Sequence, residues 1–184
     1  MNSLTAIVLA AGKGTRMRSP ISKLLHPVLG EPLVLHPLRA LRQAGVDHFI
    51  VVVGHAREEV ESAVRRAWFL KDMQVDFVEQ TEQRGTGHAV MVALSALHAE
   101  AKQVVIACGD SPHLGATDIR HLVDQRGAAP LTVLAATVED PTGLGRMECK
   151  GHLVTRIVEQ RDADATMQQV RLVNAGAYCV DASF

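Results

Sequence analysis

The sequence is poor in aromatic residues and in net charge. Among 184 residues there are one tryptophan, one tyrosine and four phenylalanines, and the formal net charge is −1. Surfaces that bind nucleic acid usually carry a basic patch and aromatic side chains on which bases stack. The composition therefore gives no reason to expect a nucleic-acid partner, and the charge gives none to expect an anionic membrane surface.

Cysteines and long hydrophobic runs are also scarce. Cys108, Cys149 and Cys179 are odd in number and far apart, so they fit neither a disulfide framework nor a zinc motif, and a reducing compartment is favoured. The apolar run at 4–11 has no basic segment before it and is too short to span a bilayer. We expect a cytoplasmic protein without a membrane partner.

Motifs for nucleophilic catalysis by the protein and for a paired-histidine metal site are missing as well. The sequence contains no Gly-x-Ser-x-Gly elbow, no H-E-x-x-H pair and no cysteine with a visible activating partner. What it does contain is an ordinary globular composition, 47% hydrophobic and 21% charged, in a length that suits one sizeable domain.

Strand-like and helix-like patterns alternate along the chain. The early strands are continuous apolar runs, as expected where helices cover both faces of a parallel sheet. Strands are expected at 5–9, 48–53, 75–78, 103–107 and 131–138, and helices at 34–44, 57–68, 87–99 and 116–126. Beyond these, 147–150 and 154–159 predict a hairpin joined through Gly151, and a further strand is expected to begin at Tyr178 after Asn174-Ala175-Gly176. The fold class is α/β, a doubly wound, mostly parallel but mixed sheet.

The most informative segment follows the first expected strand. It reads Leu9-Ala10-Ala11-Gly12-Lys13-Gly14-Thr15-Arg16-Met17, with Lys23 six residues later. Small residues let backbone N–H groups approach a phosphate closely, and the cations supply positive charge beside it. The spacing departs from a Walker A loop and from the dinucleotide fingerprint. It predicts a polyphosphate-binding loop of another kind.

Two more polar segments follow expected strands, at Glu79-Gln80 and at Cys108-Gly109-Asp110. Ligands of open α/β sheets bind outside the carboxyl ends of the strands, where such loops gather. The three segments are therefore expected to converge on one edge of the sheet.

These motifs resemble the N-acetylglucosamine-1-phosphate uridyltransferase family of sugar-phosphate nucleotidyltransferases. The resemblance spans about residues 5 to 180, and its more specific parts are Gly85-Thr86-Gly87-His88-Ala89 and Asp140-Pro141-Thr142-Gly143-Leu144-Gly145-Arg146. Ile157-Val158-Glu159 and Asn174-Ala175-Gly176 also match. The chain departs from the family pattern where it has Ser22 in place of proline, Cys108 in place of an aromatic residue and Leu144 in place of tyrosine.

The resemblance implies a Rossmann-like nucleotidyltransferase fold with a β-hairpin sugar-binding lobe. Residues 1–184 would form one domain, with the nucleotide-binding half at about 1–130 and the sugar-binding part at about 131–184. The implied reaction transfers UMP from UTP to N-acetylglucosamine 1-phosphate. It yields pyrophosphate and UDP-N-acetylglucosamine, a precursor of cell-wall and lipopolysaccharide sugars.

The resemblance also implies the roles of individual residues. Arg16 and Lys23 would be catalytic, with Lys23 also holding the sugar phosphate, and Asp110 would bind the Mg²⁺ cofactor. Gln80, Gly85 and Thr86 would read uracil, and the sugar would contact Gly145, Glu159 and Asn174. The remaining nucleotide-binding positions would be Leu9, Ala10, Ala11, Gly12, Gly14, Cys108 and Gly109.

Some alternatives stay open at this point. A flipped Gln80 carboxamide would suit cytosine as well as uracil, so neighbouring groups must fix it, and backbone N–H groups near Gly85 are candidates. His88 is expected to be structural and has no assigned role in proton transfer. The chain could also use glucose 1-phosphate with UTP or dTTP, or be a non-catalytic regulatory module that binds nucleotide sugars.

In the family a second Mg²⁺ ligand, an asparagine, comes from well beyond the last motif matched here. The sequence is therefore expected to be a C-terminally truncated domain that binds nucleotide weakly and turns over slowly by itself. A homo-oligomer would form only through regions outside these 184 residues, and whether an acetyltransferase domain follows is left open.

Overall fold

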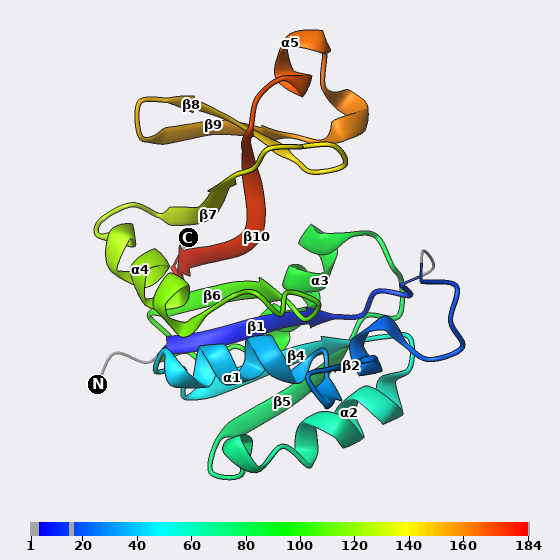
Figure 1. Ribbon diagram of the computed structural model, residues 1–184. Helices are drawn as coiled ribbons and strands as arrows, with labels where there is room; N and C mark the ends of the chain where they lie inside the picture. Colours follow the sequence, from blue (N-terminus) through cyan, green and yellow to red (C-terminus); the bar gives the residue numbers. More distant parts are fainter. Residues whose placement is uncertain (1–3, 15–16, 184) are drawn as a thin grey trace. The chain divides into compact units, whose positions relative to one another are not determined.

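The computed structural model describes residues 4–14 and 17–183. The chain forms two compact units (Figure 1). Unit 1 runs from the N-terminus to Thr132 and resumes at Tyr178, and unit 2 comprises Val133–Ala177. How the two substrates divide between these parts of the chain stays a prediction.

A parallel sheet forms the centre of unit 1, with the strand order β5-β4-β1-β6 and β10 beside β6. The register pairs Ile7 of β1 with Ile50 of β4 on one side and with Ile106 of β6 on the other. Because β5, β4, β1 and β6 run in the same direction, their carboxyl ends meet at one edge. The bounds are β1 (Leu4–Ala10), β4 (His48–Val53), β5 (Gln74–Glu79), β6 (Gln103–Cys108) and β10 (Leu172–Asp181).

Both faces of this sheet are covered, which explains the continuous apolar runs. On one face Ile7 and Ile50 pack in a core cluster with Ala89 and Ala93 of α3 (Thr86–Ala93). Their neighbours on the strands point to the other face, and there too Val8 is fully buried. Figure 1 shows α1 in front of the strands on that side. The expected α/β class with a mixed sheet is confirmed.

The helices of unit 1 lie where the periodicity predicted them, with shorter ends. The helices α2 and α3 end earlier than expected, and each is followed by a 3₁₀ turn. Pro37 lies in the first turn of α1, where its missing N–H leaves no helical hydrogen bond unmade. No helix in the described part of the chain is long and apolar enough to cross a membrane. The bounds are α1 (Leu35–Gln43), α2 (Arg57–Arg65), η3 (Trp68–Leu70), η4 (Leu94–Ala96) and α4 (Ala116–Arg126).

A small hairpin of β2 (Pro27–Val28) and β3 (Glu31–Pro32) was not predicted from the sequence. Its two-residue turn has positive φ angles at both Leu29 (50°) and Gly30 (83°), the pattern of a type I′ turn. Leucine seldom adopts a positive φ, so the sequence carries a weak signal for this turn.

Unit 2 is built on an antiparallel hairpin of β8 (Arg146–Lys150) and β9 (Leu153–Val158), as predicted. The other elements of the segment are β7 (Leu131–Thr137), which begins in unit 1, η5 (Gln160–Asp162) and α5 (Ala165–Gln168). β10 pairs with β8 at Val173 and Arg146.

The expected start of the last strand was wrong. β10 begins at Leu172 rather than at Tyr178, and Asn174-Ala175-Gly176 lies inside it. Gly176 has a φ of 75°, so a residue that signals a turn here introduces an irregularity within a continuous strand.

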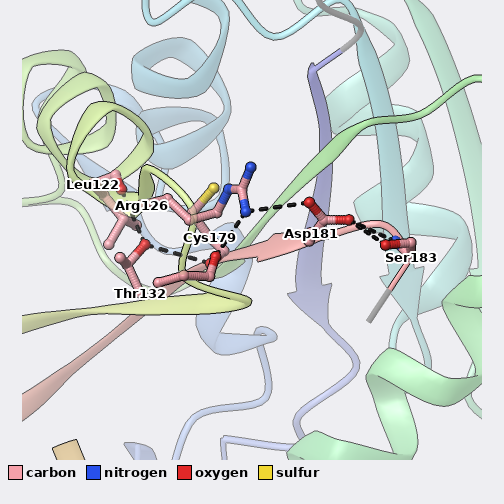
Figure 2. A network of polar contacts seen from close by, with 7 residues as sticks. Leu122, Arg126, Thr132, Cys179, Asp181 and Ser183 are labelled. Carbon is pink, nitrogen blue, oxygen red and sulfur yellow. Dashed lines mark hydrogen bonds and ion pairs between the residues drawn. The ribbon is translucent and has the colours of Figure 1, made fainter. Parts of the chain in front are cut away.

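The end of β10 belongs to unit 1 and is held there by polar contacts (Figure 2). The Arg126 guanidinium lies 3.2 Å from Asp181 and donates to the carbonyl of Ala129 at 2.7 Å. The Thr132 hydroxyl lies 3.0 Å from the carbonyl oxygen of Leu122 and 3.4 Å from that of Cys179. This network ties the last strand to α4.

The Asp181 carboxylate predicts a pH dependence of stability. Ser183 donates to it from its hydroxyl and its backbone N–H, and together with the Arg126 charge these contacts lower the pKa of Asp181 below its usual 3.8. A carboxyl with a depressed pKa stabilises the fold above its ordinary pKa and loses that contribution as the pH falls through the folded value. We expect Asp181→Asn to lower the Tm at pH 7, with the difference from the unmodified protein shrinking as the pH falls below the ordinary pKa of aspartate. A difference that does not change with pH would contradict this.

Candidate active site

A cavity of about 370 Å³ opens at the carboxyl edge of the sheet in unit 1. The loops that follow β1, β5 and β6 all contribute to it, as expected for an open parallel sheet. The lining residues are Leu9, Ala11, Gly12, Gly14, Lys23, Leu24, Gln80, Gln83, Gly85, Thr86, Ala89, Cys108 and Asp110.

An ion pair lies in the cavity. Lys23 Nζ contacts Asp110 Oδ2 across 87 residues of sequence, and both side chains are about one-third exposed. Lys23 opens the short η2 helix (Lys23–Leu25), and Asp110 follows β6. The cavity wall therefore carries the Lys23 ammonium group beside the Asp110 carboxylate. The second carboxylate oxygen, Oδ1, has no hydrogen-bond partner within 4–14 and 17–183.

Gly14 allows the loop to pass closely over Lys23. Its φ is +60°, and a Cβ built there would lie only 2.7 Å from the Cβ of Lys23. Any side chain at this position would displace the lysine. Ser22, which stands where the family has proline, has a φ of −53° that proline also adopts, so the substitution keeps the backbone that presents Lys23.

Two glutamine side chains are fixed at the cavity wall. Gln80 follows β5 and is only 5% exposed, and its Nε2 lies 3.1 Å from both the carbonyl oxygen of Gly85 and Nδ1 of His88. Gln83 Nε2 donates to the carbonyl of Ala11 at 2.8 Å, which joins the loop after β5 to the loop after β1.

Most of the predicted nucleotide-binding positions line this cavity. Ala10 and Gly109 do not, although Gly109 donates to the carbonyl of Leu9 at 2.9 Å and so supports the wall from behind. Arg16 lies outside the described residues. The sequence reasoning missed Leu24, Gln83 and Ala89 as lining residues, although Ala89 ends the recognised motif at 85–89 and Gln83 lies two residues before it.

The cysteines are free thiols, as predicted. Burial, helped by the Asp110 charge, raises the pKa of the Cys108 thiol, and burial raises that of Cys179 to about 11. Both thiols stay protonated at neutral pH, so neither is poised as a nucleophile.

The three residues predicted to contact the sugar lie together in unit 2. The Asn174 backbone N–H donates to the carbonyl of Gly145 at 2.9 Å, and a Cβ at Gly145 would lie 3.3 Å from Oε1 of Glu159. A glycine at 145 thus leaves room for Glu159 to approach the β8 strand. Their contact with a sugar stays a prediction.

The motif before this group folds as a turn held by its own side chains. Asp140 Oδ1 accepts from the Thr142 backbone N–H at 3.0 Å, and contacts with Thr142 lower the pKa of Asp140. Gly143 has a φ of 81°, and its N–H donates to Oε1 of Gln160 at 2.9 Å. These contacts stabilise the turn that leads into β8, so this part of the family motif has a structural role.

Arg146, the last residue of that motif, is 1% exposed. Its guanidinium donates to the carbonyl of Leu144 and lies 3.5 Å from that of Gln168, and no carboxylate of the described chain forms an ion pair with it. Its two terminal nitrogens link the turn to α5 through backbone carbonyls, while its buried Nε has no hydrogen-bond partner among the described residues. The sequence reasoning gave this residue no role.

A separate polar group at the start of β4 is a hydrogen-bonded network. His48 Nε2 lies 2.8 Å from Asp76, and the Gln74 amide lies 3.1 Å from Asp76 and 2.9 Å from His98 Nε2. The two imidazoles stack with centroids 4.3 Å apart, and the ligand atoms of His48, Asp76 and His98 lie within 4.8 Å of one another. The hydrogen bond from His48 lowers the pKa of Asp76, and the buried Nδ1 of His48 has no hydrogen-bond partner in the described part of the chain.

Comparison with known proteins agrees with this arrangement. The sequence matches the MobA-like NTP transferase domain over residues 6–172. The chain belongs to this family of NTP transferases. The resemblance inferred from the motifs is thus confirmed, and it extends to proteins named bifunctional protein GlmU. The one from Geobacter metallireducens is 45% identical over the whole chain, and the one from Heliobacterium modesticaldum is 45% identical over 98% of it.

The chain spans about two fifths of the length of these relatives, 38% and 39% respectively. Solved structures share the fold at lower identity. HddC from Yersinia pseudotuberculosis has a TM-score of 0.76 at 20% identity, over 96% of this chain and 76% of that one. A Bacillus anthracis protein described as a glucose-1-phosphate thymidylyltransferase has a TM-score of 0.78 at 18% identity, over 97% and 72%.

Proposed function

We propose that the chain transfers UMP from UTP to N-acetylglucosamine 1-phosphate and releases pyrophosphate. An oxygen of the sugar phosphate forms a bond to the α-phosphorus of UTP, and the bond between that phosphorus and the oxygen bridging to the β-phosphate breaks. The sugar phosphate is already an anion at neutral pH, so no general base is needed. Positioning and charge neutralisation are the main requirements.

The residues of the cavity suit those requirements. Lys23 offers a mobile positive charge near the polyphosphate loop and would hold the sugar phosphate. Arg16, in the same loop of the sequence, would stabilise charge on the transferred group. Gln80, Gly85 and Thr86 would contact the base, and Gly145, Glu159 and Asn174 would contact the sugar.

Mg²⁺ fits as the cofactor of this reaction. Its usual protein ligands are one or two carboxylates, with phosphates and water completing the coordination. Asp110 supplies such a carboxylate at the cavity wall, with Oδ1 unpaired in the described part of the protein. When bound, the ion would neutralise charge on the triphosphate. Before substrate and Mg²⁺ bind, Asp110 and Lys23 would neutralise one another's charge.

The observation that carries the proposal is the gathering of Lys23, Asp110 and Gln80 at one cavity, from three distant segments. A non-catalytic module that binds nucleotide sugars has no need of the first two. A cytoplasmic location and the absence of nucleic-acid and membrane partners complete the proposal.

The test is pyrophosphate release with a panel of nucleotides and sugar phosphates. We expect UTP with N-acetylglucosamine 1-phosphate to give the highest kcat/KM, by about tenfold or more over dTTP or glucose 1-phosphate, because a matched polar group is worth about that factor. The ratio between substrates is the readout, so a slow absolute rate does not obscure it. Preference for dTTP with glucose 1-phosphate would leave only the family assignment, and Mg²⁺-dependent binding without turnover would favour the regulatory module.

A further inference from the structure

The orientation of the Gln80 carboxamide is determined by its surroundings. Its backbone N–H donates to the carbonyl of Val53 at 2.8 Å, which anchors the residue, and the side chain is almost fully buried. Nε2 lies 3.1 Å from the Gly85 carbonyl oxygen, an atom that can only accept. The –NH₂ end therefore faces Gly85, since a flipped amide would bring two acceptors together.

His88 contacts the same –NH₂ group from α3. Its Nδ1 lies 3.1 Å from Gln80 Nε2, so it accepts the second N–H when the imidazole is neutral with its proton on Nε2. Both hydrogens of the amide are then used. Gln80 Oε1 has no partner in the described segments, although the residue lines the cavity, so this oxygen is available to a ligand.

We propose that His88 is a positioning residue that holds the Gln80 amide with its oxygen toward the base and so selects uracil over cytosine. This inference rests on the proposed function. Uracil presents an N3–H donor, which Oε1 accepts. Cytosine presents an acceptor at N3, which would face Oε1 without a hydrogen between them and leave both groups unpaired.

Gly85 and His88 act together in this arrangement. Gly85 precedes α3 with a φ of 96°, which turns its carbonyl toward Gln80, and His88 lies in the first turn of the helix that starts there. With Gly85 alone, one N–H of the amide would lack an acceptor, and the amide could rotate away from the orientation that reads uracil. The fixing groups are thus a carbonyl and an imidazole, whereas backbone N–H groups near Gly85 were expected.

The experiment compares UTP and CTP with variants of both residues. His88→Ala should reduce the UTP:CTP ratio of kcat/KM by about tenfold, the effect of one matched hydrogen bond, with the KM for the sugar phosphate unchanged. His88→Asn, whose Oδ1 can occupy the place of Nδ1, should retain most of the ratio. His121→Ala, an exposed histidine of α4, is the matched control and should leave it unchanged. Equilibrium binding of the two nucleotides gives the same comparison without turnover.

A double-mutant cycle separates positioning from a general structural effect. Gln80→Ala should lower the UTP:CTP ratio by itself, and adding His88→Ala to it should lower the ratio no further, because His88 acts through Gln80. An unchanged ratio in His88→Ala, or an equal loss for every nucleotide together with a lower Tm, would overturn the inference while leaving the proposed function intact. An unmodified protein with no preference for UTP would instead contradict the proposed function.

Discussion

Asp110→Asn is expected to lower kcat by a factor of about one hundred or more, the scale seen when one electrostatic stabiliser is removed from an active site. Asparagine keeps the size of the side chain but removes the charge that would hold Mg²⁺ and that now faces Lys23. Folding should change little, because the ion pair is about one-third exposed and such pairs contribute little to stability. The measurements are pyrophosphate release as a function of Mg²⁺ and a thermal unfolding curve.

A matched control for this variant is Asp124→Asn, which removes the same charge from an exposed position on α4. It should leave both the rate and the Mg²⁺ dependence unchanged. If Asp110→Asn turned over at a near-normal rate at ordinary Mg²⁺ concentrations, Asp110 would be only a turn residue at the end of β6.

Arg146→Ala is expected to cost about 2–4 kcal/mol of unfolding free energy, because it opens a cavity and leaves two carbonyls without their donor. The side chain is 1% exposed and joins the carbonyls of Leu144 and Gln168. Denaturant unfolding gives the free energy, and hydrogen exchange of the β8 and β9 amides shows whether the loss is centred on the hairpin.

The hairpin itself offers the control, an exposed arginine on its other strand. Arg156 forms a surface ion pair with Glu148 and has 64% of its side chain exposed. Arg156→Ala should therefore cost less than about 1 kcal/mol. Equal and small effects of the two substitutions would show that the buried guanidinium is not needed to hold the turn.

The sequence predicted the parallel sheet well for a physical reason. Continuous runs of branched residues such as 48–53 have few alternatives to a strand buried on both faces, and β4 begins and ends where expected. The strand at β10 was misplaced because its residues 174–176 have turn chemistry, which tertiary pairing with β8 overrides. The β2–β3 turn was missed because Leu29 adopts a backbone conformation that leucine rarely takes.

The candidate site also combines features that the sequence predicts with features that it does not. The positions that follow strand ends could be predicted, since the direction of parallel strands brings Lys23, Gln80 and Asp110 to one edge. The contact between His88 and Gln80 could not, because the orientation of a side-chain amide depends on which donors and acceptors the fold places beside it. Nor does the sequence reveal that Arg146 is buried, since arginine is usually exposed.

Unit 2 is a single uninterrupted stretch of chain, and unit 1 both precedes and follows it. The chain leaves unit 1 along β7 and returns along β10, two strands that pair with each other, so the exit and the return are neighbours. An insertion with adjacent ends can be replaced by another segment whose ends are equally close, with little disturbance to the host. The segment proposed to contact the acceptor sugar could thus be replaced as one piece, while the loops that follow β1, β5 and β6 keep the proposed nucleotide site.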